Sequence, residues 1–109
     1  MKKQERINQA LRLLATQFRI EANTVRLNTH NTLEHELAKA KVAYEWKKDG
    51  YMVITEAIFK NGSRADVFIP EKFLVIEVLA SESEKEALIK TAKYPDALEI
   101  VYLKTTEVL

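Results

Sequence analysis

The sequence contains no cysteine and only two histidines, two glycines and two prolines among its 109 residues. The lack of cysteine excludes disulfide scaffolds, thiolate metal sites and cysteine nucleophiles. With no cysteine, two histidines do not supply the three or four ligands of a zinc site. No apolar run approaches the ~18 residues that span a bilayer, and the polar start does not resemble a secretion signal. We therefore expect a cytoplasmic protein with no membrane contact.

Internal repeats, low-complexity stretches and linkers are missing as well. The glycine-rich motifs that hold nucleotide phosphates are also missing, so no nucleotide cofactor is expected. Hydrophobic residues make up 47% and charged residues 30%, which is ordinary for a globular protein and excludes disorder. The length predicts one domain over residues 1–109.

Charge is unevenly distributed, although the net charge is only +1. Residues 1–30 carry six basic and two acidic groups, whereas residues 51–109 carry seven basic and ten acidic groups. A basic N-terminal segment followed by an acidic C-terminal part favours a polyanion such as DNA as partner. The candidate phosphate contacts in this basic helical segment are Lys2, Lys3, Arg6 and Arg12.

Two helices are expected before residue 50. Apolar residues at helical spacing predict an amphipathic helix over residues 3–18. Its stripe either packs on the chain's own sheet or forms a homodimer surface, and consists of Ile7, Leu11, Leu14 and Phe18. Asn31 and Glu34 predict a capping box for a second helix that ends at Gly50. The expected core-facing stripe of this helix is Leu33, Leu37, Ala40 and Tyr44.

Strand patterns follow Gly50. Residues 51–59, 64–69, 73–79 and 99–103 are predicted as strands, and Asn61-Gly62 is a hairpin signal. Ser81 and Glu84 predict the cap of a helix that runs to Lys93. The expected fold class is α/β, with helices flanking a mixed four-stranded sheet in the order α-α-β-β-β-α-β.

Two acidic residues occupy strands that should be buried. If residues 71–72 form the second turn, Asp66 lies opposite Glu77, and opposed residues share one face of a sheet. Two partly buried carboxylates in contact are costly unless a cation, a proton or an arginine compensates them. A Mg²⁺ or Mn²⁺ ion would compensate the two negative charges. The alternative is the guanidinium group of Arg64, which lies opposite Leu79 in this register.

Two further acids are candidates for the same site. Glu56 faces away from Asp66 if the first hairpin loop has two residues (61–62), and shares its face if the loop has three (61–63). Glu36, beside the expected apolar stripe of the second helix, either points onto the sheet or is solvated. His35 is expected to be a hydrogen-bonding residue on the helix face.

This arrangement resembles the PD-(D/E)XK nuclease superfamily, which has the restriction-endonuclease-like fold. The resemblance rests on a helix with Glu36, then Arg-Ala-Asp66-Val and Val-Ile-Glu77-Val-Leu, within a common core over residues 31–103. It implies that Asp66 and Glu77 bind the metal and that Glu36 is the helix acid of the site. The lysine of the family motif is replaced here by Leu79. We expect its positive charge to come from Arg64, acting as an electrostatic clamp, or from a lysine of the following helix (Lys85, Lys90 or Lys93).

The expected function is a metal-dependent DNA endonuclease acting as a homodimer, with branched or structured DNA as a candidate substrate. The metal is Mg²⁺ or Mn²⁺, held by Asp66 and Glu77 and, in one register, by Glu56. The alternative is a nuclease-fold module that has lost catalysis with the motif lysine and binds DNA or serves in assembly.

Overall fold

The computed structural model describes residues 2–15, 21–80, 86 and 94–109. It is a mixed α/β fold with one four-stranded sheet, in the order β1-β2-β3-β4. β1, β2 and β3 are antiparallel, whereas β4 is parallel to β3. The elements are α1 (Lys3–Leu11), α2 (Leu33–Lys48), β1 (Ile54–Ile58), β2 (Arg64–Ile69), the 3₁₀ turn η1 (Pro70–Lys72), β3 (Leu74–Leu79), β4 (Glu99–Lys104) and α4 (Thr105–Val108).

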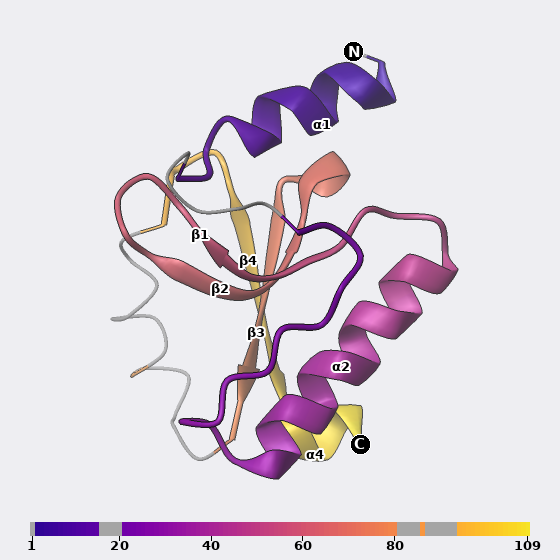
Figure 1. Ribbon diagram of the computed structural model, residues 1–109, viewed down its shortest axis with the longest axis vertical. Coiled ribbons are helices and arrows are strands. Elements are labelled where there is room, and N and C mark those ends of the chain that lie inside the picture. The colour runs from indigo at the N-terminus through magenta and orange to yellow at the C-terminus, as the bar shows by residue number, and fades with distance from the viewer. Residues whose placement is uncertain (1, 16–20, 81–85, 87–93) are drawn as a thin grey trace.

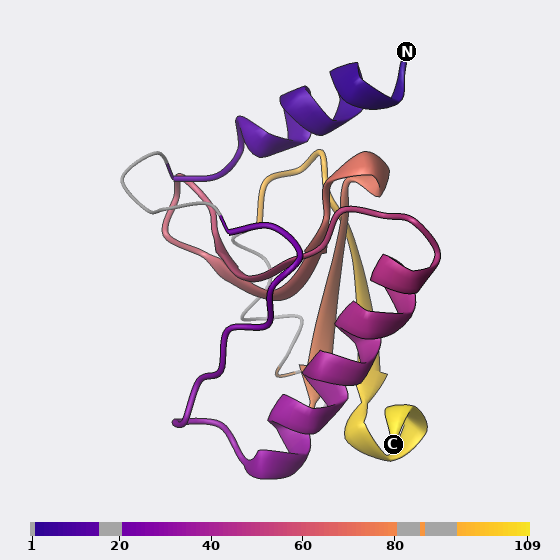
Figure 2. The ribbon, with the colours of Figure 1, turned by 45° about the vertical axis from the view of Figure 1, so that its right-hand side comes forward.

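The helices lie in three places around the sheet. α2 runs alongside the sheet, α1 lies beyond its η1 end, and α4 lies near the start of α2 (Figures 1 and 2). The predicted four-stranded mixed sheet is confirmed. α4 was not expected, and most of the predicted helix over residues 81–93 lies outside the described residues.

α1 is shorter than predicted. The helix ends at Leu11, and Leu14 instead forms a β-bridge with Phe59. Ile7, Ala10 and Leu14 are buried within the chain, so this stripe packs internally and is not a free dimer surface. Phe18 lies outside the described residues.

α2 begins and ends close to the predicted positions but presents a different face to the sheet. Thr32, not Asn31, is the cap, and its side chain accepts a hydrogen bond from His35 N at 3.1 Å. Gly50 ends the helix region with φ +94°, a conformation that favours glycine. The buried face consists of His35, Glu36, Ala38, Lys39, Val42 and Ala43.

The predicted core stripe of α2 is therefore wrong. Leu33 is 74% exposed, Leu37 51% and Tyr44 67%. The actual inner face combines small apolar residues with three polar side chains, which the hydrophobic pattern alone does not select.

Two clusters of apolar side chains form the core. The first joins α1 and Tyr94 to the sheet, and contains Ala10, Leu14, Ile54, Ala57, Phe59, Ala65, Phe68, Val75 and Tyr94. The second lies between α2 and the sheet, and contains Val42, Ala43, Val53, Val67, Ile69, Leu74 and Ile76.

Residues 21–32, which lead into α2, cross the molecule beside β1 (Figure 1). Thr55 fixes this segment, because its hydroxyl donates to Thr24 O at 3.0 Å and accepts from Arg26 N at 2.8 Å. Asn23 adds a side-chain contact, since its Oδ1 accepts from Val53 N at 3.1 Å. These bonds bring residues 26–29 to the edge of the candidate site.

Candidate active site

Asp66 and Glu77 come together as the strand register predicts. Val67 pairs with Ile76, and the β2–β3 ladder ends there. Beyond it, Val78 N donates to Asp66 Oδ2 at 2.8 Å, so the Asp66 carboxylate bridges the gap between the separating strands. Burial, followed by the charge of Asp66, raises the pKa of Glu77 well above its ordinary value. A direct side-chain hydrogen bond with Asp66 acts in the same direction.

Tyr94 completes the surroundings of Glu77. Its hydroxyl hydrogen-bonds to Glu77 Oε1 and to Arg64 O, the latter at 2.5 Å. The Tyr94 hydroxyl has only one proton to donate. Both contacts are hydrogen bonds at the same time if the hydroxyl donates to Arg64 O and accepts a proton from a protonated Glu77 carboxyl. Burial and the nearby Glu77 raise the pKa of Tyr94, so the phenol stays protonated.

His35 joins Asp66 to the start of α2. Its Nε2 lies 3.4 Å from Asp66 Oδ2, and its Nδ1 lies 2.9 Å from Glu36 Oε2. The hydrogen bond with Asp66 raises the pKa of His35 to about 9, against the opposing effect of burial, and Glu36 adds to the rise. His35 is therefore an imidazolium at neutral pH, and its expected hydrogen-bonding role is confirmed.

Glu36 is buried and fully engaged. Its Oε1 accepts from Lys39 Nζ at 2.7 Å and from Asn28 N at 2.5 Å. Burial alone would raise its pKa, but the hydrogen bonds from Lys39, Asn28 and His35 outweigh it and lower the pKa to about 2. Glu36 thus points inward from α2, which agrees with the first of its two sequence interpretations and excludes a solvated side chain.

Lys39 is the residue that sequence reasoning missed most clearly. Its side chain has no exposed surface, and its Nζ donates to Arg26 O at 2.6 Å. The same Nζ lies 3.6 Å from Glu56 Oε1. The available signal was the spacing of His35, Lys39 and Val42, which places them on one face of the helix.

Glu56 occupies a register that neither predicted hairpin loop describes. Thr55 pairs with Val67 and Ala57 with Ala65, so Glu56 lies across from Asp66. Its φ of +51° is the left-handed conformation, which is uncommon for a residue with a side chain. Glu56 is 9% exposed, and its Oε1 has no hydrogen-bond partner among the described residues.

Together these groups form a continuous chain of contacts, here called the carboxylate network. Each member touches the next, in the order Tyr94, Glu77, Asp66, His35, Glu36, Lys39 and Glu56.

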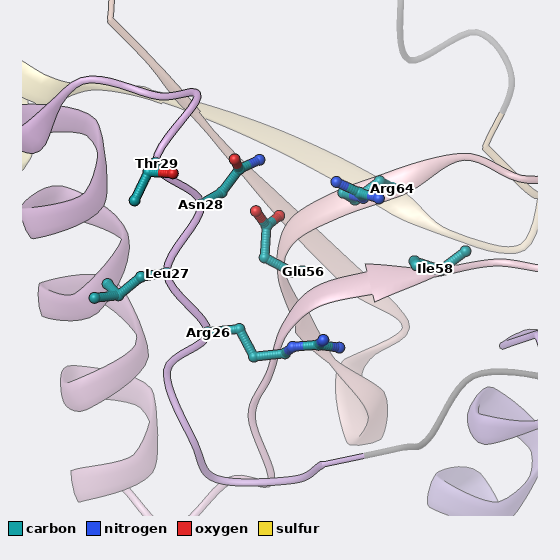
Figure 3. Close-up of a pocket in the computed structure, with 7 residues that line it drawn as sticks. All are labelled: Arg26, Leu27, Asn28, Thr29, Glu56, Ile58 and Arg64. Carbon is teal, nitrogen blue, oxygen red and sulfur yellow. The ribbon is translucent and has the colours of Figure 1, made fainter.

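A pocket of about 260 Å³ opens where this network ends at Glu56. Figure 3 shows the Glu56 carboxylate between Asn28 and Arg64, with the Arg26 side chain reaching along the neighbouring edge. The lining residues are Arg26, Leu27, Asn28, Thr29, Glu56, Ile58 and Arg64. Two cationic side chains thus flank an acidic centre, an arrangement suited to an anionic ligand that approaches the carboxylates.

The expected pairing of Arg64 with Leu79 does not form, although the β2–β3 register is the predicted one. The pairing extends only from Ile69–Leu74 to Val67–Ile76, and the strands separate before they reach Arg64 and Leu79. Arg64 therefore lines the pocket and does not lie over Leu79, which is buried. Lys85, Lys90 and Lys93 lie outside the described residues.

The basic N-terminal residues lie at a different place. Arg6 Nε donates to Glu71 O at 2.8 Å, and Lys3 Nζ lies 3.8 Å from Glu71 Oε2. These contacts dock α1 on η1, at the end of the sheet away from the start of α2 (Figure 2). Lys2 and Arg12 are exposed on the same helix segment.

The donor chemistry at Asp66 and Glu77 fits a hard divalent cation. Mg²⁺ commonly takes one or two carboxylates and fills its other positions with water and phosphate oxygens. No cluster of three or more His, Asp or Glu side chains arranged to hold a metal occurs in the described part of the chain. An ion here would therefore depend on the two carboxylates and on oxygens from water or substrate.

Comparison of the chain with protein-family models, with curated proteins and with solved structures gave no match. Among the described residues, no helix is long and apolar enough to cross a bilayer.

Proposed function

We propose that the protein is a Mg²⁺- or Mn²⁺-dependent DNA endonuclease with the restriction-endonuclease-like fold. The observation that carries the proposal is the Asp66–Glu77 pair, in which burial and a neighbouring like charge raise the pKa of Glu77. Among the described residues, the cation that pairs with these two acids is His35, which contacts Asp66. A divalent ion would relieve the repulsion and displace the proton from Glu77.

The arrangement of elements supports the same proposal. Asp66 and Glu77 come from two neighbouring strands, and Glu36 comes from a helix that packs beside them. A metal bound by Asp66 and Glu77 would supply an activated water and charge neutralisation at the phosphodiester. His35 positions Asp66, and Glu36 positions His35 through the 2.9 Å contact at Nδ1.

Arg26 and Arg64 have the second role in this proposal. Both line the pocket beside Glu56, and guanidinium groups bind phosphate in a bidentate manner. Arg64 therefore acts as an electrostatic clamp on the DNA backbone. It is a poor proton acceptor, so proton transfer belongs to other groups.

Cleavage of supercoiled plasmid and of a branched duplex, with Mg²⁺ or Mn²⁺, tests the proposal. The wild-type chain should cut, and Asp66→Asn and Glu77→Gln should each reduce the rate by roughly a hundredfold or more. The matched control is Glu99→Gln, which changes an exposed carboxylate of β4 and should cleave normally. A separate readout is thermal stability, because Mn²⁺ should raise the midpoint of the wild type and not of the site variants.

A non-catalytic DNA-binding module is the second candidate, and one observation favours it. The motif position is a buried leucine, Leu79, and a leucine neither orients water nor offsets charge. A wild-type chain that binds DNA but cuts no substrate in any divalent metal would support this candidate and refute the nuclease.

A further inference from the structure

Glu56 brings a buried acceptor without a donor to the pocket of about 260 Å³. Its side chain is 9% exposed, and its Oε1 has no hydrogen-bond partner among the described residues. The Lys39 ammonium lies 3.6 Å from this oxygen, which is too long for a hydrogen bond. The carboxylate points into the space between Asn28 and Arg64 (Figure 3). The last torsion of a glutamate is soft, so a small rotation lets Lys39 bind one oxygen while the other meets a ligand that brings an N–H group.

Two arginines line the same pocket from backbones that are held in place. Arg26 N donates to Thr55 Oγ1 at 2.8 Å, and Arg64 pairs with Ile58 in the β1–β2 ladder. Both arginines are exposed, whereas Glu56 is buried. A ligand of this pocket must therefore offer negative charge at the outside and a hydrogen-bond donor at the inside. The carboxylate would repel a purely anionic ligand, and the two guanidinium groups would repel a purely cationic one.

An unpaired nucleotide of a DNA strand has this combination of groups. Its phosphates are anionic, and its base carries an N–H donor on the edge that otherwise pairs with the opposite strand. In a duplex these donors are engaged in base pairs, and a base inside the stack does not reach a recessed carboxylate. Building on the proposed action on DNA, we propose that the pocket holds one unpaired nucleotide. Its base donates to Glu56, and its neighbouring phosphates lie on Arg26 and Arg64.

The size of the pocket agrees with a single base. About 260 Å³ corresponds to roughly nine water molecules at about 30 Å³ each, which is enough for one base and too little for a base pair. Ile58 adds an apolar side chain to the lining, against which the face of a base can pack. The inference narrows the structured DNA of the proposed function to DNA with an unpaired nucleotide at the Glu56 end of the carboxylate network.

Binding of short duplexes in EDTA, followed by fluorescence anisotropy, tests the inference on the full chain without cleavage. Three duplexes of one sequence are compared: fully paired, with one unpaired thymine, and with an abasic residue in place of that thymine. The wild type should bind the thymine bulge roughly tenfold more tightly than the other two, because only this duplex supplies a free base to Glu56. The abasic duplex controls for the bend that a bulge introduces.

Two variants separate the base contact from the phosphate contacts. Glu56→Gly removes the acceptor and suits the left-handed backbone, so it should bind the thymine bulge and the abasic duplex alike. Arg26→Gln/Arg64→Gln should instead weaken binding of all three duplexes.

Equal affinity of the wild type for the thymine bulge and the abasic duplex would overturn the inference without the use of any variant. A preference that survives in Glu56→Gly, or that requires Mg²⁺, would overturn it as well. So would competition by free thymidine monophosphate at the concentrations at which the bulged duplex binds, because the pocket would then hold a free nucleotide. Cleavage of plasmid by a wild type without this preference would refute the inference and leave the nuclease standing, whereas a wild type that binds no DNA would refute both.

Discussion

The ammonium group of Lys39, on a side chain with no exposed surface, lies 2.7 Å from Glu36 Oε1 and 3.6 Å from Glu56 Oε1. One buried cation thus joins a helix acid to a strand acid. Burial of a charge is tolerated only where partners of opposite sign are close, so the three residues depend on one another. This group anchors α2 beside the Asp66–Glu77 pair.

Removal of the Lys39 charge should be strongly destabilising. Lys39→Met preserves the length of the side chain but leaves Glu36 without its closest cation. We expect a loss of roughly 3–5 kcal/mol of unfolding free energy, measured by urea denaturation. The matched control is Lys60→Met, at an exposed position, which should change stability by less than about 0.5 kcal/mol. Equal stability of the two variants would contradict the assigned role.

Glu36 should make stability depend on acid pH. Its pKa is lowered to about 2 from 4.5, so its stabilising contribution is complete above pH 4.5 and disappears as pH falls through 2. Glu36→Gln should cost roughly 3 kcal/mol at pH 7. The stability curves of variant and wild type should converge on acidification. Parallel curves from pH 7 to pH 2 would show that Glu36 is not held ionised.

The two acids of the central pair should respond differently to neutral replacements. Glu77 is protonated at neutral pH in the absence of metal, so Glu77→Gln should alter the unfolding free energy by less than about 1 kcal/mol. Asp66→Asn should cost roughly 2 kcal/mol, because His35 loses one of its two charged partners and keeps only Glu36. Chemical denaturation of both variants without metal checks this order, and the reverse order would mean that the proton resides on Asp66.

The backbone at Glu56 offers a matched pair of substitutions. Glu56→Gly and Glu56→Ala both remove the carboxylate, but only glycine adopts φ +51° without steric cost. Glu56→Gly should therefore be more stable than Glu56→Ala by about 1 kcal/mol. An alanine variant that equals or exceeds the glycine variant would refute strain at this position.

DNA binding should depend on the pocket arginines more than on α1. Each phosphate contact contributes about 0.9 to the slope of log affinity against log salt concentration. The double variant Arg26→Gln/Arg64→Gln should therefore make this slope less steep by nearly two. The comparison variant Lys2→Gln/Arg12→Gln removes two exposed charges of the α1 region and should change it little. A slope that falls only in the comparison variant would place DNA on α1.

Local pattern alone determined much of the fold and part of the site. Hydrophobic alternation and the turn residues located all four strands to within a few residues, and the short turn at residues 70–73 set the register that brings Asp66 to Glu77. Pairing across a short turn is a local property, so sequence reasoning reaches it.

Tertiary packing decided the remainder. The inner face of α2 has a buried lysine, glutamate and histidine because β2 and β3 separate beyond Val67 and Ile76, which leaves polar groups to be satisfied from the helix. The separation also moved Arg64 away from Leu79, and the left-handed backbone at Glu56 changed what that carboxylate meets. These outcomes depend on contacts between residues distant in the chain, and hydrophobic periodicity holds no information about which polar groups find partners there.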